Sequence, residues 1–233
     1  SHSHATIRKS SFRFTKMGAD SPDSAAICFN LLGLHLSMKN QRIALPDSEI
    51  TYYLDFYSKN QTEEYLRYFE NADFWKQEPI KIFGREILQP RLTALFGEEN
   101  TSYTYSGLQM KPLHFPDILL KIKEDCEKLS NSKFNICLAN CYRNGQDSMG
   151  WHSDDEKELG KNPTIASVSF GAERSFHFKH RHEAQIKHKM VLQNGSVLIM
   201  SGATQHFYKH QVPKTKKPLP LRVNLTFRKV GYE

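Results

Sequence analysis

The chain has 233 residues, a net charge of +7 and 39% hydrophobic residues, so it can bury a sizeable core as one large domain or two small ones. Its four cysteines have no framework spacing, which predicts a reducing compartment without disulfides. No apolar run reaches the length of a membrane span, and no signal cleavage site is found. We therefore expect a protein that is not secreted and has no membrane partner, cytoplasmic in a bacterium or nuclear in a eukaryote.

The positive charge is concentrated in the last quarter of the chain. Residues 173–233 contain twelve Lys and Arg against three Glu, a balance of +9, so the remainder sums to −2. A basic region of this kind is typical of a protein with a polyanionic partner, although a merely solvated basic face has the same composition.

The first residues predict no part of the fold. Basic residues precede the apolar run 25–32, as in a signal peptide, but two aspartates separate them and no small-residue cleavage site follows. We expect residues 1–40 to be a disordered arm or an artificial extension, and residues 41–233 to form a single domain.

The domain begins with a strand and a helix. Residues 50–57 have the pattern of a strand. Ser58 and Gln61 then predict a capping box that starts a helix, with Glu63 and Glu64 in its first turn.

A hairpin and a second helix follow. Apolar residues bracket Gly84 within 80–87, which predicts a hairpin. Pro116 and Asp117 open a helix that continues to Ser130.

The rest of the chain has the alternation of short strands. Asn194-Gly195 predicts a tight hairpin turn between two of them. Many short strands with few helices indicate a mostly β fold, a double-stranded β-helix (jelly-roll) core with flanking helices. The predicted strands are 134–142, 165–170, 175–180, 187–192 and 196–200.

One short motif has the composition of a metal site. His152-x-Asp154, followed far along the chain by one more histidine, is the ligand set of mononuclear iron oxygenases. Two neutral imidazoles and a carboxylate bind one face of Fe(II) and leave the other positions open. The pair alone occurs by chance in many chains, and both His206 and His210 are candidates for the third ligand.

A polar strand near the end of the chain gives the motif weight. Arg222, Asn224, Thr226 and Arg228 alternate with apolar residues, so one face of this strand is polar. Two guanidiniums on one face are suited to a dianion, because arginine binds carboxylates in a fork geometry. A small dicarboxylate beside an iron site suggests 2-oxoglutarate. The alternative is a surface strand of a basic protein.

Together these pieces resemble the AlkB-type Fe(II)/2-oxoglutarate-dependent dioxygenases, and within them the DNA alkylation-repair members. The order and spacing agree over roughly residues 80–230, with nucleotide recognition at about 75–110 and the jelly-roll core at about 130–230. The matching pieces are residues 103–107, 140–142, 152–156, 165–171, His210 and 222–228.

The resemblance implies a role for each site residue. Fe(II) is held by His152, Asp154 and His210, since the family's His-x-x-Pro piece matches His210 rather than His206. The residues expected to bind 2-oxoglutarate are Asn140, Tyr142, Arg222, Asn224 and Arg228. The residues expected near the substrate are Tyr103 and Tyr105 beside the base, Asp155 against a cationic base, Glu156 and Arg91 next to the pocket, and Phe83 as a wedge that fills the gap left by a flipped base.

The implied reaction is oxidative demethylation of bases such as 1-methyladenine and 3-methylcytosine, using O2 and releasing formaldehyde. The expected partner is DNA, with RNA as a further candidate, and the expected state is a monomer. The same chemistry on RNA or on a protein remains the alternative. His177, His180, His182 and His188 suggest a basic loop near phosphate rather than a second metal site.

Overall fold

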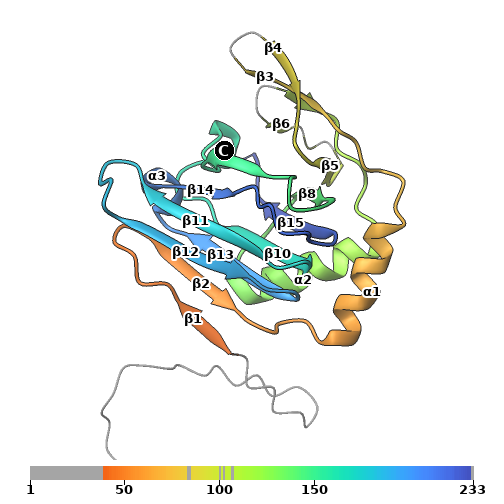
Figure 1. Ribbon diagram of the computed structural model, residues 1–233, viewed down its shortest axis with the longest axis horizontal. Helices are drawn as coiled ribbons and strands as arrows, with labels where there is room; N and C mark the ends of the chain where they lie inside the picture. The colour runs from red at the N-terminus through yellow and green to blue at the C-terminus, as the bar shows by residue number, and fades with distance from the viewer. Residues whose placement is uncertain (1–38, 83–84, 100, 102, 106–107, 232–233) are drawn as a thin grey trace, which may run out of the picture.

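The computed structural model describes residues 39–82, 85–99, 101, 103–105 and 108–231. Their helices and strands are shown in Figure 1. The order is β1 (Asn40–Arg42), β2 (Glu49–Tyr53), α1 (Lys59–Glu70), β3 (Pro79–Ile82), β4 (Arg85–Leu88), β5 (Leu92–Gly97), β6 (Tyr103–Tyr105), β7 (Leu108–Met110), α2 (Asp117–Ser130), β8 (Ile136–Tyr142), β9 (Met149–His152), a 3-10 turn (Lys157–Leu159), β10 (Ile165–Gly171), β11 (Arg174–His180), β12 (Lys187–Leu192), β13 (Ser196–Ser201), α3 (Thr204–Phe207), β14 (Tyr208–Val212) and β15 (Arg222–Arg228).

Two antiparallel sheets form the core. The major sheet has the order β1-β2-β13-β10-β15-β8-β5, and the minor sheet has the order β12-β11-β14-β9. Both sheets are built from strands far apart in the sequence, and β15, after all other strands in the chain, lies between β10 and β8. This arrangement confirms the predicted mostly β fold with a jelly-roll core.

The two faces of the major sheet bury different cores. Tyr65 and Phe69 of α1 and Ile122 of α2 pack with the outward side chains of the sheet, such as Val168 and Leu225. A second core, with Phe178 and Tyr208 of the minor sheet, fills the space between the sheets. Helices α1 and α2 therefore cover the face of the major sheet that is opposite to the minor sheet.

Both predicted helices are confirmed, with one error in detail. The Ser58 hydroxyl accepts from the Gln61 amide at 3.3 Å, and the Gln61 side chain accepts from the Ser58 amide at 3.0 Å. The placement of Glu63 and Glu64 in the first turn was wrong, because the helix begins at Lys59 and its first turn contains no acidic residue.

The Asn194-Gly195 turn is formed, but it is not a hairpin turn. It joins β12 of the minor sheet to β13 of the major sheet, so the flanking strands do not pair with each other. Gly195 has φ +74°, and a Cβ there would lie 2.9 Å from the Tyr57 carbonyl oxygen. A local turn signal thus predicted the reversal correctly, but it could not show which sheet receives each strand.

Two other strand predictions need correction. The strand expected at 50–57 ends at Tyr53, and the chain already forms β1 at Asn40, before the expected start of the fold. The strand expected at 134–142 begins only at Ile136, and Phe134 precedes it and packs in the core under the helices.

Two small hairpins, β3-β4 and β6-β7, form separate two-stranded sheets. The predicted hairpin at 80–87 is confirmed as β3 paired with β4, and it projects away from the helices in Figure 1. The wedge predicted at Phe83 lies outside the described residues. Tyr103 and Tyr105 do form a strand, β6, paired with β7, but their side chains are not among those described. No helix in the described part of the chain is long and apolar enough to cross a membrane.

Candidate active site

The three predicted metal ligands come together between the sheets. His152 ends β9 and lies directly opposite His210 of β14, with ring centroids 4.2 Å apart. Asp154 follows two residues after His152, where the chain leaves the strand. One ligand atom from each of the three side chains lies within 4.8 Å of the others. The side chains of β14 alternate between the two faces of the minor sheet, so Tyr208, His210 and Val212 point into the interior.

The ligands are held in the protonation state that a metal requires. Burial, together with a smaller effect of the nearby His152, lowers the pKa of His210 to about 3. Burial also lowers the pKa of His152. Burial alone would raise the pKa of Asp154, but Arg228 and the two histidines hold it at about 2. Two neutral imidazoles and one carboxylate therefore face each other near neutral pH, and metal binding needs no proton release from them.

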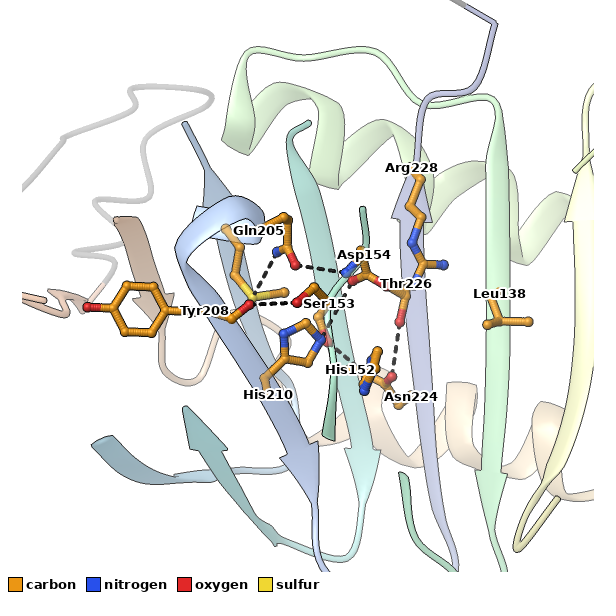
Figure 2. Close-up of polar contacts among 12 residues, drawn as sticks. Leu138, His152, Ser153, Asp154, Gln205, Tyr208, His210, Asn224, Thr226 and Arg228 are labelled. Atoms are coloured by element: carbon orange, nitrogen blue, oxygen red, sulfur yellow. Dashed lines mark hydrogen bonds and ion pairs between the residues drawn. The ribbon is translucent and has the colours of Figure 1, made fainter. Parts of the chain in front are cut away.

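Neighbouring groups fix the orientation of the ligands (Figure 2). Nδ1 of His152 lies 2.8 Å from the Gly150 carbonyl oxygen, so it carries the proton and leaves Nε2 as the nitrogen with a free lone pair. Arg228 donates to Oδ1 of Asp154 at 2.6 Å. Gln205 accepts from the Asp154 backbone amide at 2.9 Å. Each contact limits rotation of a ligand before any ion is bound.

A cavity beside the ligands is lined by the polar face of β15 and the end of β8. All five residues expected to bind the co-substrate line it, and so do the three metal ligands. The predicted residues on its wall are Asn140, Tyr142, Arg222, Asn224, Arg228, His152, Asp154 and His210.

Arg222 is the unusual group in this cavity. Its side chain is 1% exposed, and one guanidinium nitrogen donates to the Ser169 hydroxyl at 3.0 Å. Its Nε and Nη1 atoms have no hydrogen-bond partner among the described residues. Its guanidinium carbon lies 5.0 Å from the centre of the Tyr142 ring, and no described carboxylate forms an ion pair with it. Burial lowers the pKa of Arg222, because a buried cation without a counter-ion is costly.

Asn224 is held by the protein itself. Its amide nitrogen donates to the Ser167 hydroxyl at 2.8 Å and to the Val168 carbonyl at 2.9 Å. Its carbonyl oxygen accepts from Thr226 at 3.1 Å. Both amide hydrogens are therefore used within the protein, and the side chain shapes the cavity wall.

The residues expected near the substrate are more dispersed. Asp155 lies outside the cavity wall and forms an ion pair with Arg181, which also donates to the Ser153 hydroxyl at 2.6 Å. Arg91 is buried and donates to the Asn140 side-chain oxygen at 2.7 Å, so it supports a cavity residue. Glu156 is the residue before the 3-10 turn.

Sequence reasoning missed Gln205, Ser169 and Arg181. Gln205 is fully buried in the short helix α3, and its partner is 51 positions away in the sequence. A glutamine or a serine at these positions belongs to no motif, so only the tertiary arrangement shows its role.

A second histidine group does not have the geometry of a metal site. His180 lies near Asp47 and Glu183, with Nε2 3.6 Å from an Asp47 oxygen. However, Nδ1 of His180 accepts from the backbone amides of His182 and Glu183 at 3.2 and 3.0 Å. A neutral imidazole must then carry its proton on Nε2, which leaves no lone pair for a cation.

Comparisons with known proteins agree with this geometry. The family profile of the 2OG-Fe(II) oxygenase superfamily matches residues 49–228. Alpha-ketoglutarate-dependent dioxygenase alkB homolog 3 of Bos taurus is 44% identical over 165 residues, which are 67% of this chain and 57% of the relative. DNA oxidative demethylase ALKBH2 is 36% identical over 178 residues in Bos taurus, 73% of this chain and 62% of the relative. The Mus musculus ALKBH2 is 34% identical over 177 residues, 73% of this chain and 72% of the relative.

The chain thus spans less than two thirds of either bovine relative. Among solved structures, one titled "The structure of OsALKBH1" superposes with a TM-score of 0.59 at 20% identity, covering 82% of this chain and 100% of that chain. At this identity the likeness concerns the fold alone.

Proposed function

Since this chain belongs to the 2OG-Fe(II) oxygenase superfamily, in its AlkB branch, we propose that it uses Fe(II), 2-oxoglutarate and O2 to demethylate N-alkylated bases in DNA. Several relatives carry the name DNA oxidative demethylase. The proposal concerns the described site and is supported by two features of it.

The first feature is the donor set. Two neutral imidazoles and one carboxylate, His152, His210 and Asp154, form the facial arrangement that non-haem Fe(II) oxygenases use, with the remaining positions left for co-substrate and O2. Hydrogen bonds with Gly150, Gln205 and Arg228 hold these donors in place. The residues present therefore fit iron.

The second feature carries the proposal: Arg222 is a buried cation with two unpartnered nitrogens on the wall that also holds the metal ligands. An anionic co-substrate would supply the missing counter-ion, and a carboxylate matches the fork geometry of the guanidinium. Asn140 and Tyr142 on the adjacent strand β8 would hold its polar atoms, with Arg91 orienting Asn140. The residues present therefore also fit 2-oxoglutarate.

When bound, the iron would supply the oxidation that couples decarboxylation of 2-oxoglutarate to hydroxylation of the N-methyl group, which leaves as formaldehyde. The protein's own groups have other tasks. Arg228 keeps Asp154 anionic, Arg222 aligns the co-substrate, and the apolar residues Leu138 and Phe176 limit access of water to the cavity.

Recognition of the base is a further part of the proposal. A base within a duplex can reach a buried cavity only when it is flipped out, and bases methylated on the pairing edge are flipped at lower cost because they pair badly. Several such lesions carry positive charge. Asp155, one residue after the ligand Asp154 and partly exposed, is the carboxylate that we assign to recognition of that charge.

The test is reconstitution with Fe(II) and 2-oxoglutarate under argon, followed by O2 and an oligonucleotide that carries one 1-methyladenine. Single-stranded DNA, duplex DNA and RNA of the same sequence are compared. Mass spectrometry follows loss of the methyl group, and succinate is measured in parallel. His210→Ala is the inactive variant. His206→Ala is the matched control, since His206 is an exposed neighbour outside the ligand group.

The expected result is demethylation of DNA with one succinate formed per methyl group removed, lost in His210→Ala and kept in His206→Ala. Faster turnover of the RNA would transfer the proposal to the alternative substrate. Succinate without loss of the methyl group would overturn the assignment of the substrate. The absence of both products from an iron-loaded protein would overturn the proposed activity.

A further inference from the structure

The outer face of the minor sheet is strongly basic. Its strands alternate, so Phe176, Phe178 and His210 point inward while their neighbours point to solvent. The outward side chains include four lysines, one histidine and one tryptophan, and none is a carboxylate. We call this set the basic outer face: Lys179, Lys187, Lys189, Lys209, His177 and Trp151.

The lysines lie directly opposite one another. Lys179 of β11 pairs in register with Lys187 of β12 on one side and with Lys209 of β14 on the other. Lys189 lies opposite His177. Burial lowers the pKa of His177, and the charge of Lys189 lowers it further. Like charges in directly opposed cross-strand positions destabilise a sheet. None of the four lysines forms an ion pair with a carboxylate of the described residues, so stability does not explain this arrangement.

Trp151 connects the basic outer face to the active site. It is 38% exposed, and Nζ of Lys179 lies 4.4 Å from the centre of its ring system. Its neighbour in the chain, His152, points to the other side of the same strand and belongs to the metal group. An exposed aromatic ring beside a row of unpaired cations is the composition of a surface that binds single-stranded nucleic acid, with bases stacking on rings and lysines contacting phosphates.

We propose that the basic outer face binds the sugar-phosphate backbone of single-stranded DNA that extends from the nucleotide in the active site. Lys179 and Lys209 contact phosphates nearest to the site, Trp151 stacks on an unpaired base, and Lys187 and Lys189 extend the track across β12. This inference rests on the proposed function for its choice of DNA. It is tested by binding alone, so either can fail without the other.

The experiment measures the dissociation constant of an unmodified single-stranded 16-mer at a series of salt concentrations. The variant is Lys187→Gln/Lys189→Gln, because these lysines lie on β12, the strand of the minor sheet that is not adjacent to the ligand strands. The matched control is Lys121→Gln/Lys128→Gln, two lysines of α2 on the opposite side of the molecule. Each phosphate contact contributes about 0.7 to the slope of log affinity against log salt, so loss of two contacts lowers the slope by about 1.4.

Tryptophan fluorescence gives an independent readout, since the chain has only two tryptophans. Trp75 donates to the Phe69 carbonyl at 2.8 Å and is packed against the core under the helices, so quenching by DNA should come from Trp151. We expect quenching in the wild type and its loss in Trp151→Phe. The unfolding temperature of Lys187→Gln/Lys189→Gln should be no lower than that of the wild type, because repulsion between opposed lysines is removed.

An unchanged salt slope in the β12 variant, or an equal decrease in the α2 control, would overturn the proposal. So would quenching that persists in Trp151→Phe. Polyglutamate serves as a competitor: if it displaced the oligonucleotide at equal charge concentration, the face would be assigned to an acidic protein instead. Weak displacement by polyglutamate together with the lower slope supports the DNA track.

Discussion

Arg228 donates from Nη2 to Oδ1 of Asp154 at 2.6 Å, and the two side chains are 3% and 1% exposed. The second arginine of the β15 motif therefore engages a metal ligand, while Arg222, on the same face of the strand, has two nitrogens with no partner in the described part of the chain. Two arginines that look equivalent in the sequence thus have different neighbours. One neutralises the ligand carboxylate, and the other is available to an anion.

Replacing Arg222 should weaken 2-oxoglutarate binding with little effect on the metal. In Arg222→Met the buried charge-assisted hydrogen bonds to a carboxylate are lost, which costs about 1.5–3 kcal/mol and raises KM for 2-oxoglutarate roughly tenfold or more. Mn(II) serves as a redox-stable substitute for iron. Its Kd should change less than about twofold, because the substitution leaves the three metal ligands in place. Isothermal titration of metal and co-substrate separates the two effects. Equal losses in both would show that Arg222 only supports the fold of the site.

Replacing Gln205 should give the opposite pattern. Its side-chain oxygen accepts from the backbone amide of Asp154, and its side-chain nitrogen lies 3.7 Å from the Met200 sulfur. In Gln205→Leu that amide loses its partner, so we expect metal affinity to fall about tenfold, in the range seen for lost outer-shell partners. Gln205→Glu keeps an acceptor and should retain more of the affinity. If both variants bound Mn(II) as the wild type does, Gln205 would have no role in positioning the ligand.

The stability of the metal-free protein should fall on acidification between about pH 6.5 and pH 3. His210 has a pKa of about 3 in the folded protein and about 6.5 when unfolded, so between these values the unfolded chain binds more protons. The contribution is therefore complete above pH 6.5 and is lost as pH falls toward 3. Asp154, with a folded pKa of about 2, adds a further loss below about pH 4. Denaturant unfolding in EDTA at pH 7 and pH 4.5 measures the fall.

His210→Gln provides the comparison for this pH dependence. Glutamine does not titrate, so the difference in unfolding free energy between pH 7 and pH 4.5 should be smaller in the variant. An identical difference in the two proteins would contradict the assignment, and the remaining acid sensitivity would belong to other groups.

Glu127 should contribute to stability far from the active site. Its carboxylate accepts from the Phe134 amide at 2.9 Å and from Lys133 at 2.9 Å, and it lies 3.1 Å from Lys123. Burial would raise its pKa, but the Phe134 amide and the two lysines lower it overall. This stabilisation is present above the unfolded pKa and is lost as pH falls through the folded pKa. Glu127→Ala should lower the unfolding free energy by about 1–3 kcal/mol, because a buried amide loses its acceptor.

Glu127→Gln is the matched variant, since it keeps an oxygen for the Phe134 amide but loses the charge. It should be less destabilised than Glu127→Ala at pH 7, and its stability should depend less on pH below the ordinary pKa of a glutamate. A loss of stability that is equal in the two variants would mean that the ion pairs, rather than the hydrogen bond to Phe134, dominate.

Charge recognition by Asp155 can be tested with two substrates. Asp155→Asn should reduce kcat/KM for cationic 1-methyladenine by about tenfold, as for loss of one charge-assisted contact. Turnover of a neutral lesion such as 1-methylguanine should fall much less. Arg181→Gln, which removes the ion-pair partner of Asp155, controls for loss of loop structure. Equal losses for the two lesions in Asp155→Asn would assign this carboxylate to the loop and not to the base.

The sequence predicted those parts of the site that depend on local order. The structure confirms the His152-x-Asp154 pair and the two-residue period of β15, because both follow directly from backbone geometry. The capping box of α1 was predictable for the same reason. The partner of Arg228 is 74 positions away, and that of Gln205 is 51 positions away. No periodic pattern reports such contacts, because they are decided by which strands pair.

The same limit explains the turn at Asn194-Gly195. Its residues satisfy the local conformation, but the strands on its two sides join different sheets, since β12 pairs with β11 and β13 pairs with β10 and β2. A two-residue signal contains no information about those distant partners.

The central position of β15 has a consequence for how the protein is made. This strand follows every other strand in the sequence, yet it completes the pairing of both β10 and β8. During synthesis the major sheet would therefore remain in two parts until residue 228 has left the ribosome. The major sheet must then fold largely after this segment has been translated. Folding should be slow, because most of the strand pairings join distant parts of the sequence. Arg222 and Arg228 arrive with the same strand, so a nascent chain cannot assemble the anion site before its sheet is closed.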